Sequence, residues 1–161
     1  MRISRVVAGT VAVVALASGC ASSIGGSAST GSSVTSGPYT CRPAVDASAC
    51  GQVGKISADD VKRHGGGGAA TLVQFVASTR EKANKAAGGD IVPGDQKVYL
   101  IQITGNFIGG PDSYPCCTAP SPRPFTELTA IVDASTFMGL DNGMSSQPAD
   151  LSSLGTVITV Q

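Results

Sequence analysis

The chain has 161 residues, which is enough for one small domain with a modest core. Its 11 basic and 11 acidic residues give a formal charge of zero, and only 14% of its residues are charged, so the charge gives no reason to expect binding to nucleic acid or to an anionic lipid surface. It contains no tryptophan, and large aromatic anchors for a protein interface are scarce.

The first twenty residues read MRISRVVAGTVAVVALASGC and have the layout of a secretory signal. Two arginines precede an apolar run from Val6 to Ala17, which is too short to span a bilayer, and small residues lead to Cys20. This ending resembles the lipobox of bacterial lipoproteins, especially actinobacterial ones, with Leu16 one place further out than usual. The resemblance implies that residues 1–19 are removed and that Cys20 is lipidated, which would anchor the protein to the extracytoplasmic face of the cell membrane. The alternative is an ordinary secretory signal that happens to contain a cysteine.

The segment after Cys20 is dominated by serine, glycine and threonine. Residues 21–40 read ASSIGGSASTGSSVTSGPYT and contain too few apolar side chains to form a core. Such a composition predicts a flexible tether. We therefore expect residues 20–40 to hold a single folded domain, residues 41–161, away from the membrane.

Four cysteines remain in the predicted domain: Cys41, Cys50, Cys116 and Cys117. An even number in an exported chain indicates disulfides. Because adjacent cysteines rarely bridge each other, the favoured pairing joins Cys41 and Cys50 each to one of the vicinal pair. The alternative is a Cys41–Cys50 bridge together with a vicinal bridge. No metal site is expected, because neither pair has the Cys-x-x-Cys spacing common in metal sites.

The start of the domain contains little regular structure in this interpretation. Residues 41–54 are expected to form an irregular, pinned loop, and Ser57–Arg63 a single helical turn with Ser57 as its N-cap. The run Gly65–Gly68 then ends that turn. It lacks the Gly-Lys-Ser/Thr of a phosphate-binding loop, so we expect a loose connector.

Residues 69–77 form the first clear strand, because β-branched and aromatic residues crowd a short run. Ser78 and Glu81 have the spacing of a capping box, which predicts a helix over residues 79–87. The apolar positions of that helix are all alanine, so it should pack closely on a sheet. The run KVYLIQIT at residues 97–104 is apolar on both faces and predicts a central strand.

A long proline-rich loop, PDSYPCCTAPSPRP, occupies residues 111–124. Proline removes backbone donors and excludes this stretch from the interior of a sheet. Loops of this length are either functional or surface excursions. Tyr114, Arg123 and Phe125 make it the candidate binding loop, and the alternative is a loop that serves only the disulfide architecture.

The last third predicts residues 127–133 as a strand, 137–140 as its antiparallel return, 141–143 as a turn, 149–154 as one helical turn and 156–160 as a final strand. The predicted fold class is α+β. It consists of a small, mostly antiparallel sheet with one packed helix, in β-α-β-β-β order, stapled by disulfides.

The phrase LTAIVDASTFMGL, which begins at Leu128, resembles the strand, Asp-Ala-x-Thr-Gly turn and strand of PepSY-type domains. Phe137 stands where that family usually has glycine. The resemblance covers about residues 98–141. It implies a small exported module of the cell envelope, inhibitory or ligand-binding, and it brings no catalytic residues.

A catalytic function is not expected. The only histidine, His64, lies beside the glycine run, and no Gly-x-Ser-x-Gly elbow occurs. The possible carboxylate pairs are Asp59 with Asp60 and Asp133 with Asp141. Caps and turns explain these residues equally well.

The predicted function is therefore a non-catalytic module that binds an unknown protein or small ligand and needs no cofactor. The alternative is a thiol redox or metal-binding module that uses Cys116 and Cys117. Vicinal thiols bind soft metals, and a vicinal disulfide can act as a redox switch.

Overall fold

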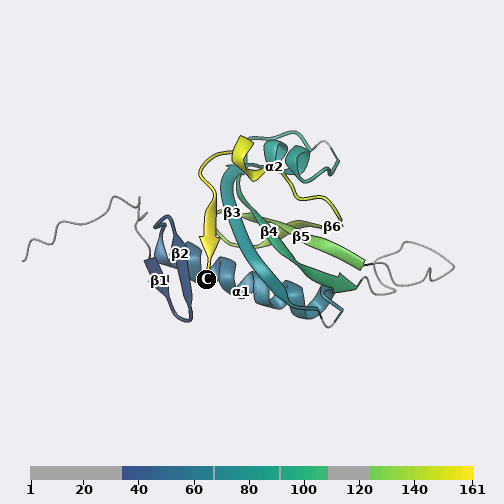
Figure 1. Ribbon diagram of the computed structural model, residues 1–161. Coiled ribbons are helices and arrows are strands. Elements are labelled where there is room, and N and C mark those ends of the chain that lie inside the picture. Colours follow the sequence, from purple (N-terminus) through teal and green to yellow (C-terminus); the bar gives the residue numbers. More distant parts are fainter. Residues whose placement is uncertain (1–33, 67, 91, 109–123) are drawn as a thin grey trace, which may run out of the picture. The chain divides into compact units, whose positions relative to one another are not determined.

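The computed structural model describes residues 34–66, 68–90, 92–108 and 124–161, which belong to one compact unit. These residues form a seven-stranded antiparallel sheet, two α-helices and a short 3-10 helix (Figure 1). The α+β class and the presence of a disulfide agree with the sequence prediction. The predicted order of elements differs, because it lacks a hairpin and a long helix at the start of the domain.

The strands are β1 (Val34–Ser36), β2 (Tyr39–Arg42), β3 (Ala70–Thr79), β4 (Lys97–Ile108), β5 (Pro124–Asp133), β6 (Gly139–Ser145) and β7 (Ile158–Val160). The helices are α1 (Ala47–His64), α2 (Arg80–Ala86) and the 3-10 helix η2 (Leu151–Ser153). In the sheet the strand order is β1-β2-β7-β3-β4-β5-β6, and every neighbouring pair is antiparallel. The last strand therefore lies between the first hairpin and β3, as the yellow arrow in Figure 1 shows.

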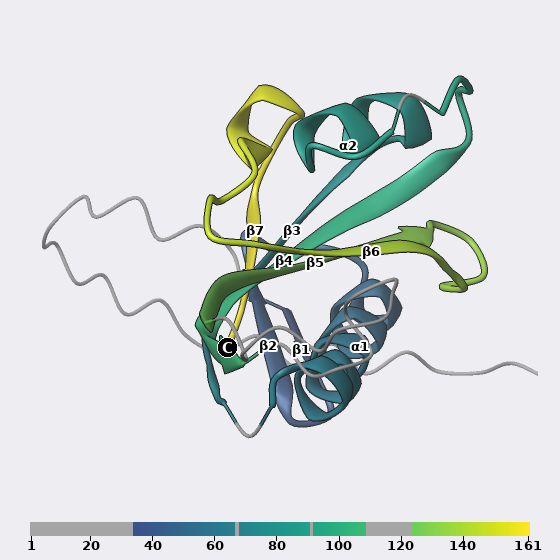
Figure 2. The same cartoon turned by 90° about the vertical axis from the view of Figure 1, so that its right-hand side faces the viewer.

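The sheet is covered on both faces (Figure 2). α1 packs on one face, and α2 and η2 pack on the other. The buried core on the α1 side comprises Cys41, Cys50, Val53, Phe75, Ile101, Ile103, Phe107, Leu128, Ala130, Val132, Ile158 and Val160. The smaller core on the α2 side comprises Val76, Ala83, Val98, Leu100, Ile131 and Leu151. β4 contributes to both cores, and residues 100–103 are buried without interruption, as expected for a central strand.

The prediction of an irregular segment followed by a single helical turn was wrong, because α1 runs for 18 residues. Asp46 is its N-cap, and the carboxylate accepts hydrogen bonds from the backbone N–H of Ser48 at 2.8 Å and of Ala49 at 3.2 Å. Its buried face carries small residues at helical spacing, which include Gly54 and Ser57. Small and glycine residues conceal an amphipathic pattern, and this explains the missed helix.

The N-terminal hairpin of β1 and β2 begins inside the segment that the sequence assigned to the tether, residues 20–40, and extends two residues beyond it. Residues 34–36 pair with residues 39–41, and the backbone of Thr40 exchanges two hydrogen bonds with that of Gln161. Tertiary pairing with β7 thus recruits a serine- and glycine-rich stretch that has no strand pattern of its own.

The disulfide joins Cys41 in β2 to Cys50 in α1, with the Cα atoms 5.9 Å apart. The favoured crossed pairing, in which each of these cysteines joins one of the vicinal pair, is therefore wrong. The two cysteines are nine positions apart in the sequence. The short distance along the chain lets the first helical turn fold back on β2, so the bridge is a local one.

Two smaller predictions also failed. Residues 141–143 lie within β6 instead of forming a turn, and Gly143 pairs with Thr129 of β5. α2 has Thr79 as its N-cap, and its hydroxyl makes no capping hydrogen bond in the described structure. Within the described residues the buried hydroxyl of Ser78 has no partner, so the predicted capping box does not form.

Three glycines of the run after α1, Gly65, Gly66 and Gly68, are described and lie close to their neighbours. The N–H of Gly65 donates to the carbonyl of Val61 at 2.8 Å, and the N–H of Gly68 donates to Gly65 at 2.8 Å. Gly66 has a φ of 56°, in the left-handed region that favours glycine. A Cβ atom on Gly68 would collide with the backbone carbonyl of Asn106. These glycines allow the turn to pass close to the backbone of β4.

Candidate functional site

Most of the candidate binding loop falls outside the described residues. This applies to Tyr114 and Arg123, and to the vicinal Cys116 and Cys117. Phe125 is described, and its half-buried side chain packs against the core on the α1 side. It lies in β5 opposite Phe107 of β4. Phe125 is therefore part of the sheet and not a free anchor in the loop.

Cys20, the predicted site of lipidation, also lies outside the described residues. Of the remaining candidates, His64 is half-buried in the last turn of α1 and Asp59 is exposed. Burial raises the pKa of Asp60, although the nearby charges of Arg63 and His64 act against this effect. Among the described residues, no three His, Cys, Asp or Glu side chains come together as a metal-binding group.

Asp133, one of the carboxylates considered as a pair with Asp141, is held by a dense set of hydrogen bonds. Asp133 Oδ1 accepts from the backbone N–H groups of Ser135 and Thr136 at 2.9 and 2.8 Å, and from their hydroxyls at 2.6 and 3.0 Å. Gln96 donates to the other carboxylate oxygen at 2.8 Å. These hydrogen bonds, led by those from Ser135 and Gln96, hold the pKa of Asp133 far below its usual range. Asp133 therefore anchors the turn between β5 and β6.

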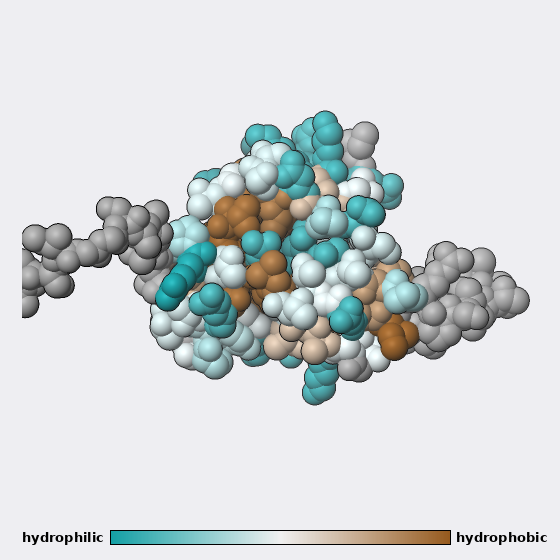
Figure 3. Space-filling view, viewed as in Figure 1, coloured by the Kyte–Doolittle hydropathy of each residue, from teal (hydrophilic) through white to brown (hydrophobic). Residues whose placement is uncertain are grey.

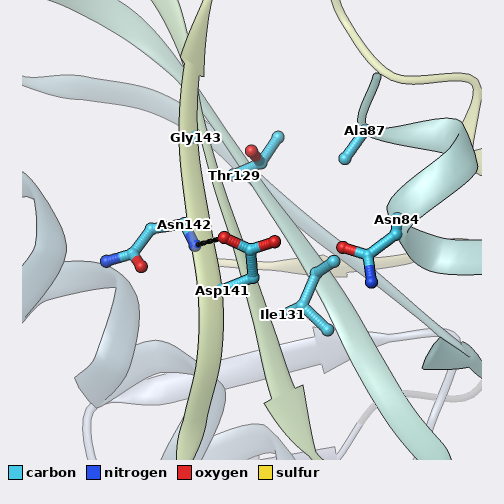
Figure 4. A pocket seen from close by; sticks show the side chains of 7 residues that line it. All are labelled: Asn84, Ala87, Thr129, Ile131, Asp141, Asn142 and Gly143. Atoms are coloured by element: carbon cyan, nitrogen blue, oxygen red, sulfur yellow. Dashed lines mark hydrogen bonds between the residues drawn. The ribbon is translucent and has the colours of Figure 1, made fainter. Parts of the chain in front are cut away.

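A small polar pocket lies between α2 and the outer strands of the sheet. We call it the α2 pocket, and it is lined by Asn84, Ala87, Thr129, Ile131, Asp141, Asn142 and Gly143. Its volume is about 40 Å³. β5 and β6 pair Thr129 with Gly143 and Ile131 with Asp141, so the alternation of the strands brings these four positions to one face. Asn84 faces them from α2 (Figure 4).

Asn84 is the most unusual side chain of the α2 pocket. It is only 1% exposed, yet among the described residues neither its amide nitrogen nor its amide oxygen has a hydrogen-bond partner. An unpaired buried amide costs about 1–3 kcal/mol. Figure 4 shows its amide and the carboxylate of Asp141 pointing toward each other across the pocket. The opening between them is a place where a bound group would give Asn84 the partners that it lacks.

The other polar groups of the α2 pocket are held in place by the sheet. Asp141 is exposed, and its Oδ1 accepts from the backbone N–H of Asn142 at 2.8 Å. Thr129 is largely buried. A Cβ atom on Gly143 would lie 2.9 Å from the Thr129 hydroxyl, so glycine keeps the floor of the pocket open. A carboxylate, a hydroxyl and an amide therefore line one small space.

A second hollow, which is larger and mostly apolar, lies between α1 and the sheet. Its volume is about 430 Å³, within the range of small-molecule pockets. It is lined by Tyr39, Gly54, Ser57, Ala58, Val61, Gly68, Ala69, Ala70, Val73, Val160 and Gln161. The hydroxyl of Ser57 is buried here, and within the described part of the chain it has no partner. We call this space the α1 hollow.

The α1 hollow adjoins an incomplete part of the sheet. β7 pairs with β3 only from Val73 to Phe75, so among the described strands residues 70–72 pair with β4 alone. Leu72 is 39% exposed beside this edge. Figure 3 shows hydrophobic residues at the surface over β3. A β-bulge near Thr71 interrupts the ladder between β3 and β4 at this edge, as bulges at sheet edges commonly do.

The α2 pocket is hard to predict from the sequence. Asn84 lies in a helix whose pattern is defined only by alanines, and residues 141–143 have the composition of a turn. The available signal was in β5, where Glu127 and Thr129 alternate with apolar residues although both faces of the strand are covered. Polar residues at buried strand positions indicate a polar network or a site.

No family model, curated protein or solved structure matches this chain. Within the described residues, no helix combines the length and the apolar character needed to cross a membrane.

Proposed function

We propose that the protein is a cell-envelope lipoprotein, anchored to the extracytoplasmic face of the membrane through a lipid on Cys20, whose folded domain is a non-catalytic binding module. The Cys41–Cys50 disulfide carries the localisation part of this proposal. Disulfides of this kind persist in oxidising compartments and are rare in the cytosol. The lipobox-like segment before Cys20 supplies an export and anchoring signal that agrees with such a compartment.

The α2 pocket carries the binding part of the proposal. A fully buried amide without partners is expensive, and it is tolerated where a ligand or water completes its hydrogen bonds. Three carboxylates of the domain have structural roles. Asp133 anchors a turn, and Asp46 and Asp150 cap helices. These roles favour a domain that holds a ligand on rigid elements over one that transforms it.

Lipidation at Cys20 is tested with the full-length chain in a bacterial host that processes lipoproteins. We expect the mature protein to partition into the detergent phase, to incorporate labelled fatty acid and to begin at a diacylglyceryl-modified Cys20. Cys20→Ser should lose the label and the detergent partitioning, whereas Ser18→Ala keeps a small residue and should retain both. An unlabelled wild-type protein cleaved at another residue would refute the anchor.

One observation favours a second candidate function. Because Cys41 and Cys50 are bonded to each other, neither can bond to Cys116 or Cys117. The vicinal cysteines then either bridge each other or remain thiols, and both states fit the thiol redox or metal-binding module predicted as the alternative. Counting the free thiols of the mature protein under denaturing conditions separates the two states: two thiols favour a metal-binding module, and none favours a vicinal redox disulfide. A disulfide from Cys116 or Cys117 to another chain would contradict both.

A further inference from the structure

We propose that the α2 pocket is a low-affinity binding site for Ca²⁺, and this inference rests on the proposed extracytoplasmic function. The ligands are the carboxylate of Asp141, the amide oxygen of Asn84 and the hydroxyl of Thr129, with water completing the coordination shell. All three residues line the same 40 Å³ space. A space of this size exceeds that of one water molecule and suits an ion with part of its hydration shell.

The chemistry of the lining selects a hard cation. Every polar side chain that lines the α2 pocket offers an oxygen atom as a ligand. The lining contains no cysteine, methionine or histidine. Carboxylate, amide and hydroxyl oxygens are ligands of Ca²⁺, Mg²⁺ and Mn²⁺, and soft metals prefer thiolate or imidazole. Ca²⁺ accepts irregular oxygen shells, whereas Mg²⁺ demands a near-ideal octahedron. Ligands contributed by a helix and two strands are better suited to the more flexible ion.

A hydrated ion would also solve the problem that Asn84 presents. Both polar atoms of its amide lack partners among the described residues, so a single acceptor or a single donor cannot satisfy it. The amide oxygen of Asn84 coordinates the ion, and a water molecule bound to the ion accepts a hydrogen bond from the amide nitrogen. The carboxylate of Asp141, which points toward Asn84 in Figure 4, supplies the negative charge.

The small number of charged ligands in the α2 pocket sets the expected affinity for Ca²⁺. Asp141 is the only carboxylate in the lining, and sites with few charged ligands bind Ca²⁺ weakly. Extracellular modules bind Ca²⁺ with Kd values of about 10⁻⁴–10⁻³ M. A site in this range would be occupied outside the cell and empty in the cytosol. This is the arrangement expected of a domain that becomes stable after export.

The test is the melting temperature of the full-length chain in detergent, followed by circular dichroism while CaCl₂ replaces NaCl at constant ionic strength. We expect Tm to rise by about 5 °C at ten times Kd. Asp141→Asn should abolish the rise. The control, Asp59→Asn, removes an exposed carboxylate from α1 and should leave the rise unchanged. Isothermal titration with CaCl₂ should give a stoichiometry of one.

Asn84→Asp provides a gain-of-function test. A second carboxylate in the α2 pocket should lower the melting temperature without Ca²⁺ and should tighten Ca²⁺ binding by about tenfold. An equal rise in wild type and Asp141→Asn, or no rise in wild type, would overturn the proposal and leave water as the occupant. The lipidation assay on Cys20 is independent, so a failure of Ca²⁺ binding is distinguishable from a failure of the proposed function.

Discussion

The ring of Phe137 stacks on the ring of Tyr99, with the centroids 5.8 Å apart and the planes 15° from parallel. Phe137 is also the only non-glycine residue with a positive φ in the described structure, at 57°. A left-handed backbone costs an ordinary side chain about 1–2 kcal/mol. A stacked aromatic pair contributes about 0.5–1.5 kcal/mol beyond the area that it buries. The stacking therefore offsets the strain and explains how phenylalanine can occupy a turn position that suits glycine.

The strain and the stacking can be separated by two substitutions at this position. Phe137→Ala removes the stacking and keeps the strain, so it should lower the free energy of unfolding by about 1–3 kcal/mol. Phe137→Gly removes both and should be about 1 kcal/mol more stable than the alanine variant, the reverse of the usual order. Urea unfolding followed by circular dichroism measures these differences. Met138→Ala, at a neighbouring residue that is 68% exposed, is the control and should change little.

The turn at Asp133 should make stability depend on pH. The folded state holds the pKa of Asp133 far below the unfolded value of about 3.9, so it favours the ionised form. The resulting stabilisation is complete above about pH 4 and is lost as the pH falls toward the folded-state pKa. Asp133→Asn should therefore be less stable than wild type at pH 7, and the difference should shrink below pH 4.

The urea midpoints of wild type and Asp133→Asn, measured from pH 7 to pH 2, test this dependence. Asp95→Asn is the matched control. Asp95 is an exposed carboxylate two residues before the start of β4, the end of that strand that pairs with Asp133. It should follow the wild-type curve. If the gap between wild type and Asp133→Asn stayed constant with pH, ionisation of Asp133 would have no part in holding the turn.

The strands that a sequence can predict here are those whose own side chains form the core. Residues 97–104 and 127–133 were found because their apolar residues crowd short β-branched runs, and both lie in long strands. β1 and β2 carry no such pattern. They pair because β7, from the other end of the chain, lies beside them. Pairing between strands so far apart in the sequence cannot be recognised from the local composition of either strand.

The candidate site is harder to predict than the fold, because ordinary secondary structure accounts for each of its residues when the local sequence is considered alone. Asn84 fits the exposed face of a short helix, and Asp141 fits a turn. Only the tertiary arrangement, with α2 above the pairing of β5 and β6, brings the two together. The binding loop was chosen for its aromatic and basic residues, but Phe125 packs into the core. Tyr114 and Arg123 of that loop lie outside the described residues, so the structure corrects the expectation for Phe125 alone.

The N-cap of α1 gives a third prediction. The carboxylate of Asp46 accepts two backbone hydrogen bonds at the start of the helix. Asp46→Ala should lower the free energy of unfolding by about 1 kcal/mol. Asp46→Asn keeps an acceptor oxygen at the same place and should retain most of the stability. Equal losses in the two variants, measured by urea unfolding, would show that the charge matters more than the hydrogen bonds.

The close approach of Tyr39 to α1 gives a fourth prediction. A Cβ atom on Gly54 would collide with three ring carbons of Tyr39, so the ring can lie this close to the helix only because residue 54 is glycine. Gly54→Ala should therefore destabilise the domain by about 1–3 kcal/mol, although alanine is the better helix former. Gly51→Ala, on the same helix, is the control and should not share this loss. A Gly54→Ala variant as stable as wild type would contradict the packing of Tyr39.

The Cys41–Cys50 disulfide gives a fifth prediction, and it concerns covalent structure. Trypsin is a poor choice for mapping, because it cuts poorly before Pro43 and leaves both cysteines in one peptide. A protease that cuts before aspartate separates Cys41 from Cys50 at Asp46. We expect the two resulting peptides to remain joined until a reductant is added.

The same digest distinguishes the competing pairings. A linkage from either Cys41 or Cys50 to a peptide containing Cys116 and Cys117 would contradict the observed bridge and would restore the crossed pairing. Replacing both Cys41 and Cys50 with alanine should lower the free energy of unfolding by about 2–4 kcal/mol, because the bridge closes a loop in the unfolded chain. Cys116→Ala/Cys117→Ala should leave the bridge between β2 and α1 intact. A loss of stability confined to the first double variant would show that the N-terminal hairpin is held to α1 by this local bridge, independently of the proline-rich loop.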